Sequence, residues 1–214
     1  MFENLQGFFE STMGQVIVIA VIAVFFFLIV FPMGAQKEKK MDTKAITISA
    51  LLIALAVGLG QIKLFEMPYG GTVTVFSMLP VALCGYILGI RRGVMAGMCV
   101  GLLNLIFGPY VIHPVQLLVD YPFAFGALGL AGFFSESGKN GLTKGYLLGL
   151  FARYICAVVS GIVFFGAYAP EGFNAVTWSL FYNFTYLAAE GILTVVIISL
   201  PPVKKALEGL KKQL

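Results

Sequence analysis

Seven long apolar stretches, separated by short polar segments, constrain this chain more than any other feature. They cover residues 15–35, 44–62, 73–90, 93–108, 116–134, 145–168 and 176–200. A helix needs about 20 apolar residues to cross a bilayer, so these stretches predict membrane-spanning helices. Only 11% of the residues are charged, against about 25% in a typical soluble domain. The sequence therefore predicts an all-α integral membrane protein and argues against a soluble enzyme or a disordered chain.

The first apolar stretch, 15–35, predicts an uncleaved membrane anchor rather than a signal peptide. Its leader, MFENLQGFFESTMGQ, has two acidic residues and no basic one, whereas a signal peptide begins with a positively charged region. We expect three parts in the chain. They are an N-terminal extension with this extra anchor (1–40), a six-helix membrane domain (41–203) and a basic cytoplasmic tail (204–214).

The basic residues predict the orientation of the chain in the membrane. Seven threaded spans place twelve of the fourteen basic residues on one side, with Lys63 opposite and Arg153 inside a span. The twelve are Lys37, Lys39, Lys40, Lys44, Arg91, Arg92, Lys139, Lys144, Lys204, Lys205, Lys211 and Lys212. Loops rich in lysine and arginine stay in the cytoplasm. We therefore expect a multi-pass protein of the cell membrane with its N-terminus outside and its C-terminus in the cytoplasm.

Small residues recur at a spacing that predicts close helix packing. Glycine accounts for 25 of the 214 residues, and Gly93, Gly97 and Gly101 follow one another at every fourth position. Membrane helices associate largely by packing over such small residues. Ordinary packing explains the pattern without any functional role.

No motif of an enzyme, a metal site or a cofactor site is present in the sequence. The HExxH, GxSxG and CxxC patterns are missing, and the single histidine, His113, has no partner for metal binding or catalysis. The segment GFFSESGKN at 132–140 departs from the phosphate-binding loop in spacing and in its last residue. The basic residues form short blocks between spans, which does not indicate nucleic-acid binding. We expect no catalytic residue, no metal and no cofactor.

Three ionisable residues fall inside or at the end of predicted spans. They are Asp120, Arg153 and Glu190, and such residues are functional candidates because charge is costly in a membrane. Arg153 and Glu190 lie at similar depth, so we expect them to neutralise each other as a structural pair. A direct role of Arg153 in ligand binding is the alternative. Asp120 lies at the outer end of its span, with no basic residue near it in sequence.

Aromatic residues are concentrated at the outer ends of the predicted spans. This set comprises Tyr69, Tyr110, Tyr121, Phe164, Phe165, Tyr168, Trp178, Tyr182 and Tyr186. An interfacial aromatic belt is one explanation, but a belt forms at both membrane faces and the cytoplasmic face has few aromatic residues. Aromatic rings beside an unpaired carboxylate instead predict a pocket for a flat organic cation.

Four runs of sequence resemble the thiamine-specific substrate-binding subunits of energy-coupling factor transporters, the ThiT family. The runs are MPYGGTVTVFSMLP at 67–80, IHPVQLLVDYPFAFGALGLAG at 112–132, RYICAVVSGIVFFGAYAPEG at 153–172 and WSLFYNFTY at 178–186. The resemblance implies six membrane helices and a thiamine pocket open to the outside. It also implies that the chain has no ATPase of its own and works with a transmembrane coupling subunit and two ATP-binding-cassette ATPases.

The resemblance also implies roles for individual residues. Asp120 falls where the family has an acid that contacts the aminopyrimidine ring, and Asn183 falls at a polar contact near the thiazolium ring. The other implied substrate-binding positions are aromatic walls, a close-approach glycine and a basic position: Tyr110, Tyr121, Phe165, Trp178, Gly161 and Arg153. Many members have histidine in place of Ala157 and tyrosine in place of Trp178.

Two other functions stay open at this point. One is the same machinery carrying a related heterocycle, such as the pyrimidine precursor of thiamine or another vitamin. The other is a structural membrane protein without a transport role.

The first helix of the predicted six-helix domain carries two alanines one turn apart, Ala50 and Ala54. Residues at i and i+4 lie on one helix face, and two methyl groups there form a shallow groove for another helix. Spacing alone favours packing inside the bundle. The resemblance instead implies that this AxxxA face docks on the coupling subunit.

Overall fold

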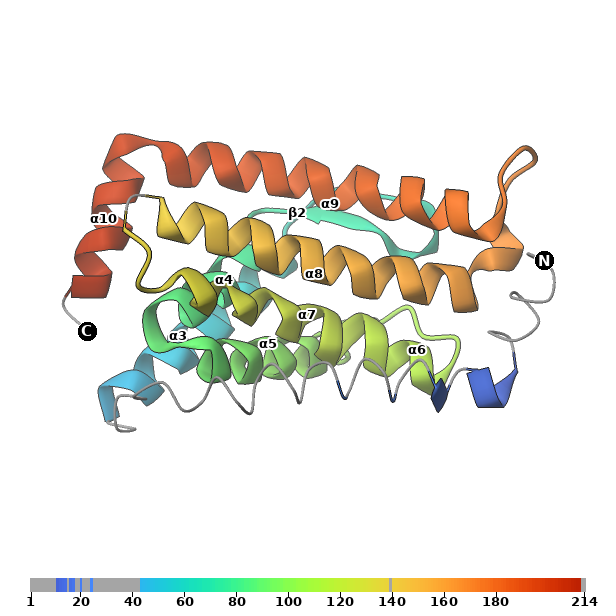
Figure 1. Ribbon diagram of the computed structural model, residues 1–214, viewed down its shortest axis with the longest axis horizontal. Coiled ribbons are helices and arrows are strands. Elements are labelled where there is room, and N and C mark those ends of the chain that lie inside the picture. The colour runs from blue at the N-terminus through green and yellow to red at the C-terminus, as the bar shows by residue number, and fades with distance from the viewer. Residues whose placement is uncertain are drawn as a thin grey trace.

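A computed structural model describes residues 11–14, 16, 17, 20, 24, 43–138 and 140–212 (Figure 1). The predicted anchor at 15–35 and the basic residues before residue 43 lie almost wholly outside the described residues. The family-like part of the chain, from residue 43 onwards, is described nearly throughout.

Helices form most of the described chain; most of them lie along the long axis in Figure 1, and the last one crosses the end of the bundle. The helices are α3 (Thr43–Gly60), α4 (Met78–Leu88), α5 (Ile90–Asn104), α6 (Pro114–Leu118), α7 (Ala124–Ala127), α8 (Gly141–Phe164), α9 (Ala175–Ser199) and α10 (Pro201–Lys212). Short irregular helices lie between them: η1 (Pro68–Gly70), η2 (Val119–Phe123), η3 (Leu128–Phe134) and η4 (Gly166–Tyr168). Among the described residues, four helical stretches are long and apolar enough to cross a membrane: Thr43–Gly60, Pro114–Phe134, Gly141–Phe164 and Ala175–Ser199.

The prediction of a purely helical protein is wrong at one place. A two-stranded antiparallel sheet, β1 (Lys63–Glu66) and β2 (Thr72–Thr74), interrupts the helices between α3 and α4. The predicted span 73–90 therefore begins as a strand, and its helix is α4 alone. Val73 and Val75 contributed to an apolar run, and periodicity alone does not distinguish a short strand from a helix.

The helix boundaries follow from local chemistry. Asn174 begins α9 with a capping box, in which its side chain accepts a hydrogen bond from the backbone N–H of Thr177. The same helix ends at Ser199 because Leu200, which precedes Pro201, has extended backbone angles. Beyond this end, residues 204–212 of the expected basic tail belong to α10.

The stretch from Pro114 to Phe134 is one continuous but irregular helix. Proline at 122 lacks the N–H that an α-helix would use, and the chain forms a π-helical turn at Val119–Phe123 around it. Such π turns occur often at functional sites. Asp120 lies in this turn.

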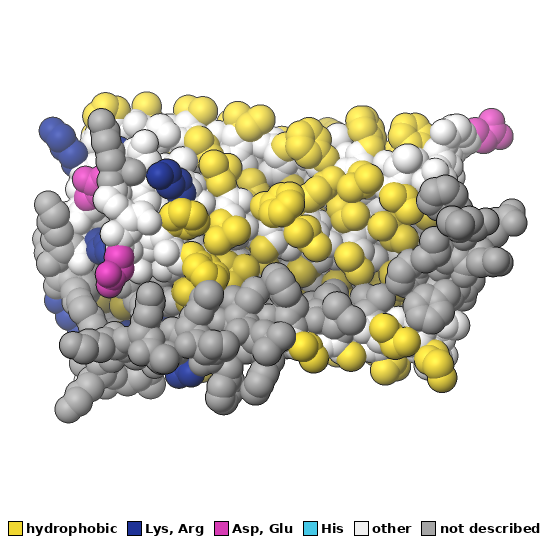
Figure 2. All heavy atoms as spheres, viewed as in Figure 1, with side chains coloured by type: hydrophobic (Ala, Val, Ile, Leu, Met, Phe, Trp, Pro, Cys, Tyr) yellow, Lys and Arg dark blue, Asp and Glu magenta, His cyan; other side chains and the backbone are white. Residues whose placement is uncertain are grey.

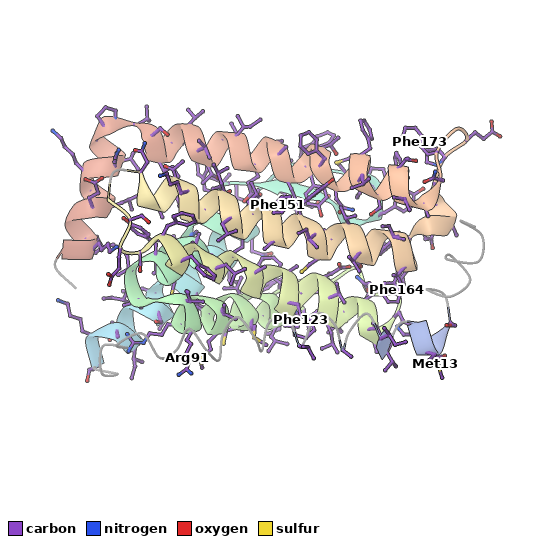
Figure 3. The ribbon with its side chains drawn as sticks, viewed as in Figure 1. Met13, Arg91, Phe123, Phe151, Phe164 and Phe173 are labelled. Carbon is purple, nitrogen blue, oxygen red and sulfur yellow. The ribbon has the colours of Figure 1, made fainter. Side chains whose placement is uncertain are left out.

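The surface agrees with a membrane environment. Figure 2 shows hydrophobic side chains spread over the long face of the bundle, while the visible charged side chains lie near its two ends. Phe151 on α8, labelled in Figure 3, is 60% exposed. Leu51 on α3 and Ile192 on α9 are each 64% exposed. Lipid tails are the medium in which such exposed apolar side chains are stable.

Glycines let α4, α5 and the 114–134 stretch approach one another at backbone distance. A Cβ atom added at Gly129 would lie 2.1 Å from the Val94 nitrogen, and one at Gly93 would lie 2.4 Å from the Gly85 Cα. Gly97 faces the carbonyl of Phe125 at 2.2 Å in the same way. The recurring glycines of the sequence are therefore packing positions inside the bundle.

Replacement of Gly129 by alanine is expected to destabilise the protein. The new methyl group has no room between two backbones, and overpacking of this kind costs about 1–3 kcal/mol or more. Gly58→Ala on α3 is the matched control, because nothing lies within 4 Å of its added Cβ. Thermal unfolding in detergent should show a lower Tm for Gly129→Ala and an unchanged or higher Tm for Gly58→Ala. Equal Tm values would contradict the close backbone contact.

Candidate functional site

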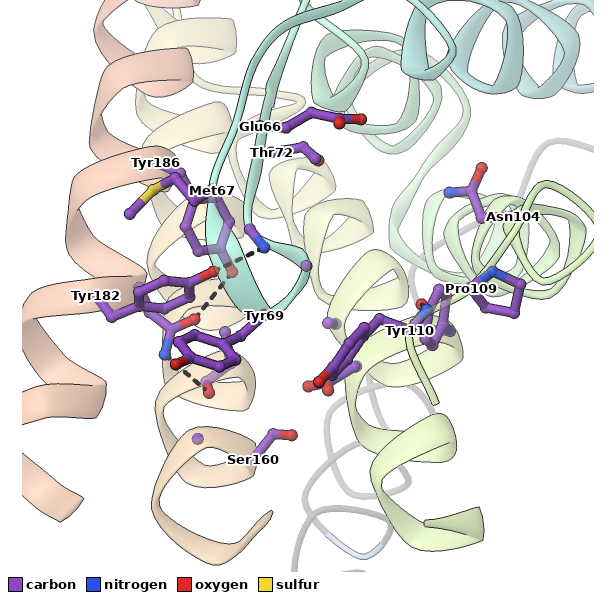
Figure 4. A pocket seen from close by; sticks show the side chains of 18 of the residues that line it. Glu66, Met67, Tyr69, Thr72, Asn104, Pro109, Tyr110, Ser160, Tyr182 and Tyr186 are labelled. Atoms are coloured by element: carbon purple, nitrogen blue, oxygen red, sulfur yellow. Dashed lines mark hydrogen bonds between the residues drawn. The ribbon is translucent and has the colours of Figure 1, made fainter. Parts of the chain in front are cut away.

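A cavity of about 380 Å³ opens at the end of the bundle opposite α10. Its walls come from the β1–β2 hairpin, the loop after α5, the π turn, α8 and α9 (Figure 4). Pockets for small organic molecules commonly have volumes of about 300–1,000 Å³. The cavity is therefore of a size to hold one small molecule.

Asp120 projects into the cavity from the π turn and is held by one neighbour. Gln116, one turn earlier, donates from Nε2 to the Asp120 carboxylate at 2.6 Å. The same Gln116 amide also donates to the carbonyl of Tyr110 at 3.1 Å and accepts from the N–H of Ile112 at 3.2 Å. Gln116 is only 2% exposed. It thus fixes both the carboxylate and the loop that leads into α6.

His113 begins α6 and has a structural role at that position. Its Nδ1 atom accepts a hydrogen bond from the N–H of Val115 at 3.1 Å, and its ring stacks on Phe164 with centroids 5.3 Å apart. Proline at 114 occupies the first helical position, where no N–H is needed. His113 therefore caps the start of α6.

The predicted ion pair between Arg153 and Glu190 is wrong. The Arg153 guanidinium carbon lies 3.9 Å from the ring centre of Phe125, and its Nη1 atom is buried without a hydrogen-bond partner. An ion pair does form in the hairpin, between Lys63 and Glu66. The sequence indicated that Arg153 and Glu190 lie at similar depth in the membrane. It did not indicate how each helix is rotated about its axis, and hence whether the two side chains face each other.

Glu190 instead holds the segment between β2 and α4. One carboxylate oxygen accepts from the N–H and the hydroxyl of Thr74 at 2.9 and 2.7 Å. The other accepts from the Ser77 hydroxyl at 3.2 Å and the Met78 N–H at 3.3 Å. Met78 begins α4, where a negative charge is favoured by the helix dipole. Glu190 is 3% exposed, so four hydrogen bonds take the place of solvation.

The tip of the hairpin is fixed to α9 by Tyr182. Its hydroxyl accepts from the Gly71 N–H at 2.9 Å and donates to the Pro68 carbonyl. A Cβ atom at Gly71 would lie 2.6 Å from that hydroxyl, so only glycine fits at this position. Tyr69 at the tip has a φ of +66° and its ring lies 5.0 Å from that of Tyr168. The hairpin therefore closes one side of the cavity with an aromatic contact.

Aromatic side chains line the rest of the wall. The ring centres of Tyr110 and Phe165 are 5.9 Å apart, and those of Trp178 and Tyr182 are 5.6 Å apart. Tyr121 accepts a hydrogen bond from the Tyr110 N–H at 2.9 Å, which links the loop to the π turn. Aromatic residues that were distant in sequence thus form one surface around the cavity.

The α8–α9 contact beside the cavity is tight and polar. A Cβ atom at Gly161 would lie 2.1 Å from the Ser179 hydroxyl oxygen. Asn183 donates to the carbonyl of Ala157 at 3.2 Å, and its Oδ1 accepts from the Tyr186 hydroxyl at 2.9 Å. Gly161 is therefore required for helix approach, and Asn183 presents its amide at the cavity wall.

The structure brings all eight predicted substrate-binding residues to this one cavity. They are Tyr110, Asp120, Tyr121, Arg153, Gly161, Phe165, Trp178 and Asn183. Sequence reasoning missed Gln116 and Ser160, which also line it. Gln116 had a signal, since it lies one helical turn before Asp120. Ala50 and Ala54 lie elsewhere, on the exposed face of α3.

Comparison with known proteins gives a consistent result. The profile of a family described as "Thiamine transporter protein" matches residues 46–208. The thiamine transporter ThiT of Bacillus subtilis (strain 168) is 33% identical over 77% of this chain and 90% of its own length. That of Lacticaseibacillus paracasei is 29% identical over 74% of this chain and 83% of its own.

A solved structure supports the fold. The structure of ThiT from Listeria monocytogenes matches with a TM-score of 0.62 at 24% sequence identity, and it covers 74% of this chain and 94% of that one. The match extends over nearly the whole of the solved chain, so the bundle around the cavity is a shared architecture.

Fold and site together define a multi-pass membrane protein of the transport class, with a binding cavity at one end of its helical bundle. The family has transport proteins as members and not enzymes. The chain belongs to the thiamine transporter protein family.

Replacement of Glu190 by glutamine tests the hydrogen-bond arrangement around this residue. Each carboxylate oxygen accepts one backbone N–H, from Thr74 or Met78, and a backbone N–H cannot rotate away from a glutamine NH2 group. One donor is thus left facing a donor, which costs about 1–3 kcal/mol. We expect a lower Tm in detergent for Glu190→Gln, with little change for the exposed Glu171→Gln. A Glu190→Gln protein as stable as wild type would contradict the arrangement.

Proposed function

We propose that this protein binds thiamine in the cavity and serves as the substrate-binding subunit of an ATP-driven energy-coupling factor transporter. Membership of the thiamine transporter family supports thiamine uptake. The observation that carries the assignment of the site is the half-buried carboxylate of Asp120 inside a cavity walled by aromatic rings.

The chemistry of the wall suits a flat heterocyclic cation. Asp120 accepts hydrogen bonds from a ligand amino group and neutralises positive charge. Aromatic faces near a cation contribute about 0.5–2 kcal/mol each, and Tyr110, Phe165 and Trp178 lie where they can stack on the rings. Asn183 offers a polar contact at the α9 side, and Gly161 keeps the wall narrow. Arg153 is the basic member of this site.

A second ligand is suggested by two departures from the family pattern. Ala157 lines the cavity where many relatives have histidine, and Trp178 stands where they have tyrosine. Compared with histidine, alanine at position 157 offers no hydrogen-bonding group and leaves more room in the cavity. This change favours a related heterocycle such as the pyrimidine precursor of thiamine. This ligand lacks the cationic thiazolium ring, so parallel titrations with both compounds separate the two candidates.

Energy for transport must come from other subunits in this proposal. The sequence has no nucleotide-binding motif, so a transmembrane coupling subunit and two ATP-binding-cassette ATPases would supply it. The exposed alanines of α3, Ala50 and Ala54, offer a docking groove. The end of the bundle that carries α10 and its lysines would face the cytoplasm, which places the cavity at the outer face.

Neutralisation of Asp120 tests the ligand assignment. Asp120→Asn keeps an oxygen for the Gln116 amide but removes the negative charge, so thiamine affinity should fall by about 1.5–3 kcal/mol, the range for a charged hydrogen bond. Calorimetry measures the affinity. In the wild-type protein, the fluorescence of Trp178, the single tryptophan, should also change saturably when thiamine is added. Glu171→Gln removes an acid from the outer loop after η4 and should leave affinity unchanged. Equal affinity in Asp120→Asn and wild type would remove the carboxylate from the site.

Bulky residues on α3 test the docking face. The double variant Ala50→Trp, Ala54→Trp should lose transport and co-purification with the coupling complex, because indole rings keep another helix from approaching. Thiamine binding should persist, since neither residue lines the cavity. Ile192→Trp with Val196→Trp is the matched control, because it adds two tryptophans at the same spacing on the exposed face of α9. Loss of thiamine binding or of folding in the α3 variant would place Ala50 and Ala54 in the core instead.

A further inference from the structure

Two hydrogen-bond donors in the described cavity wall are buried and have no partner. They are the hydroxyl of Ser160 and the Nη1 group of Arg153, and Ser160 is only 1% exposed. Leaving a buried donor unsatisfied costs about 1–3 kcal/mol. Native proteins tolerate this cost mainly where a ligand or an ordered water completes the site.

The Ser160 hydroxyl differs from two other hydroxyls in these helices. Ser49 donates to the carbonyl four residues earlier at 2.9 Å, and Thr194 does the same at 2.8 Å. This local bond is the common way to satisfy a hydroxyl within a membrane helix. Ser160 does not make it, and Figure 4 shows its side chain directed from α8 into the cavity, toward the side where Tyr110 lies.

Ser160 and Arg153 present their groups to the same part of the cavity. They are seven residues apart on α8 and hence lie on one helix face. Both lie close enough to Asp120 to act on its carboxylate, yet neither makes an ion pair or a hydrogen bond with it within the usual limits. The cavity wall thus has an acceptor, Asp120, near two donors that have no hydrogen-bond partner in the protein.

We propose that Ser160 is a specificity-determining donor, which together with Arg153 binds a hydrogen-bond acceptor of the ligand while Asp120 binds the adjacent donor. This inference rests on the proposed function. An amino group beside an unprotonated ring nitrogen, the edge of a 4-aminopyrimidine, has this donor–acceptor order. A 4-oxopyrimidine reverses the order, because its carbonyl would face the Asp120 carboxylate and its ring N–H would face the donors. Serine can also accept, but Arg153 can only donate, so the reversed edge is disfavoured.

The alanine variant separates a ligand-binding hydroxyl from a structural one. Ser160→Ala removes a group that has no partner in the protein, so its Tm without ligand should equal that of wild type or exceed it. Its thiamine affinity should fall about tenfold, which corresponds to one lost hydrogen bond near the upper end of the usual range. Ser160→Cys keeps a similar volume and a weak donor and should fall between alanine and wild type.

Two ligands measured by calorimetry in detergent complete the experiment. They are thiamine and its analogue with oxygen in place of the 4-amino group, oxythiamine. Wild type should bind thiamine more tightly, and Ser160→Ala should narrow the ratio of the two affinities by about the same tenfold factor. Ser49→Ala is the matched control, because it removes a serine hydroxyl from α3 outside the cavity. It should change neither the affinity nor the ratio.

The possible outcomes distinguish this inference from the proposed function. Wild-type protein that binds neither compound would overturn the thiamine assignment itself. Wild type that binds thiamine, with unchanged affinity in Ser160→Ala, would overturn only the role of Ser160. A lower Tm or loss of folded protein in Ser160→Ala would also overturn it, because the hydroxyl would then support the fold and not the ligand.

Discussion

Contact between backbones, made possible by glycine, fixes the helix that carries the site. Gly97 and Gly101 of α5 face the carbonyls of Phe125 and Tyr121, and an added Cβ at either glycine would lie within 2.3 Å of them. Side chains at these two positions would force α5 and the 114–134 stretch apart. The position of Asp120, one residue before Tyr121, therefore depends on two positions where α5 has no side chain. In lipid, where apolar burial between helices contributes little, such close packing is a main source of helix association.

The second requirement is that irregular backbone near the membrane must find hydrogen bonds inside the protein. The structure meets it with side chains from α9. Glu190 accepts two backbone N–H groups at the start of α4 and in β2, and Tyr182 bonds both sides of the hairpin tip. Gln116 serves the loop before α6 in the same way. These three residues allow a hairpin and a loop to form cavity walls that straight helices could not provide.

The polar groups of the cavity thus divide into two kinds. Glu190 and Gln116 have hydrogen bonds to the protein and hold backbone in place. Arg153 and Ser160 have donor groups without partners, and Asp120 retains acceptor capacity beyond the single bond from Gln116. The Glu190 carboxylate stabilises the fold, whereas the Asp120 carboxylate can still accept hydrogen bonds from a ligand. The cavity can therefore be rigid and still bind a polar ligand.

The sequence by itself predicted the membrane class, the approximate helices and eight candidate binding residues, all of which line the cavity. Apolar runs and the placement of charge are local properties of the chain, and the family-like runs around Asp120 and Trp178 identified positions residue by residue. It did not determine the hairpin, whose short apolar strands resemble helix sequence, nor the partner of Glu190. Similar depth in two spans suggested Arg153 as the partner of Glu190. Its true partners, Thr74 and Ser77, lie more than 110 residues before Glu190 in the chain. Only the tertiary structure decided these contacts, because the rotation of each helix and the path of each loop depend on which neighbours pack against it.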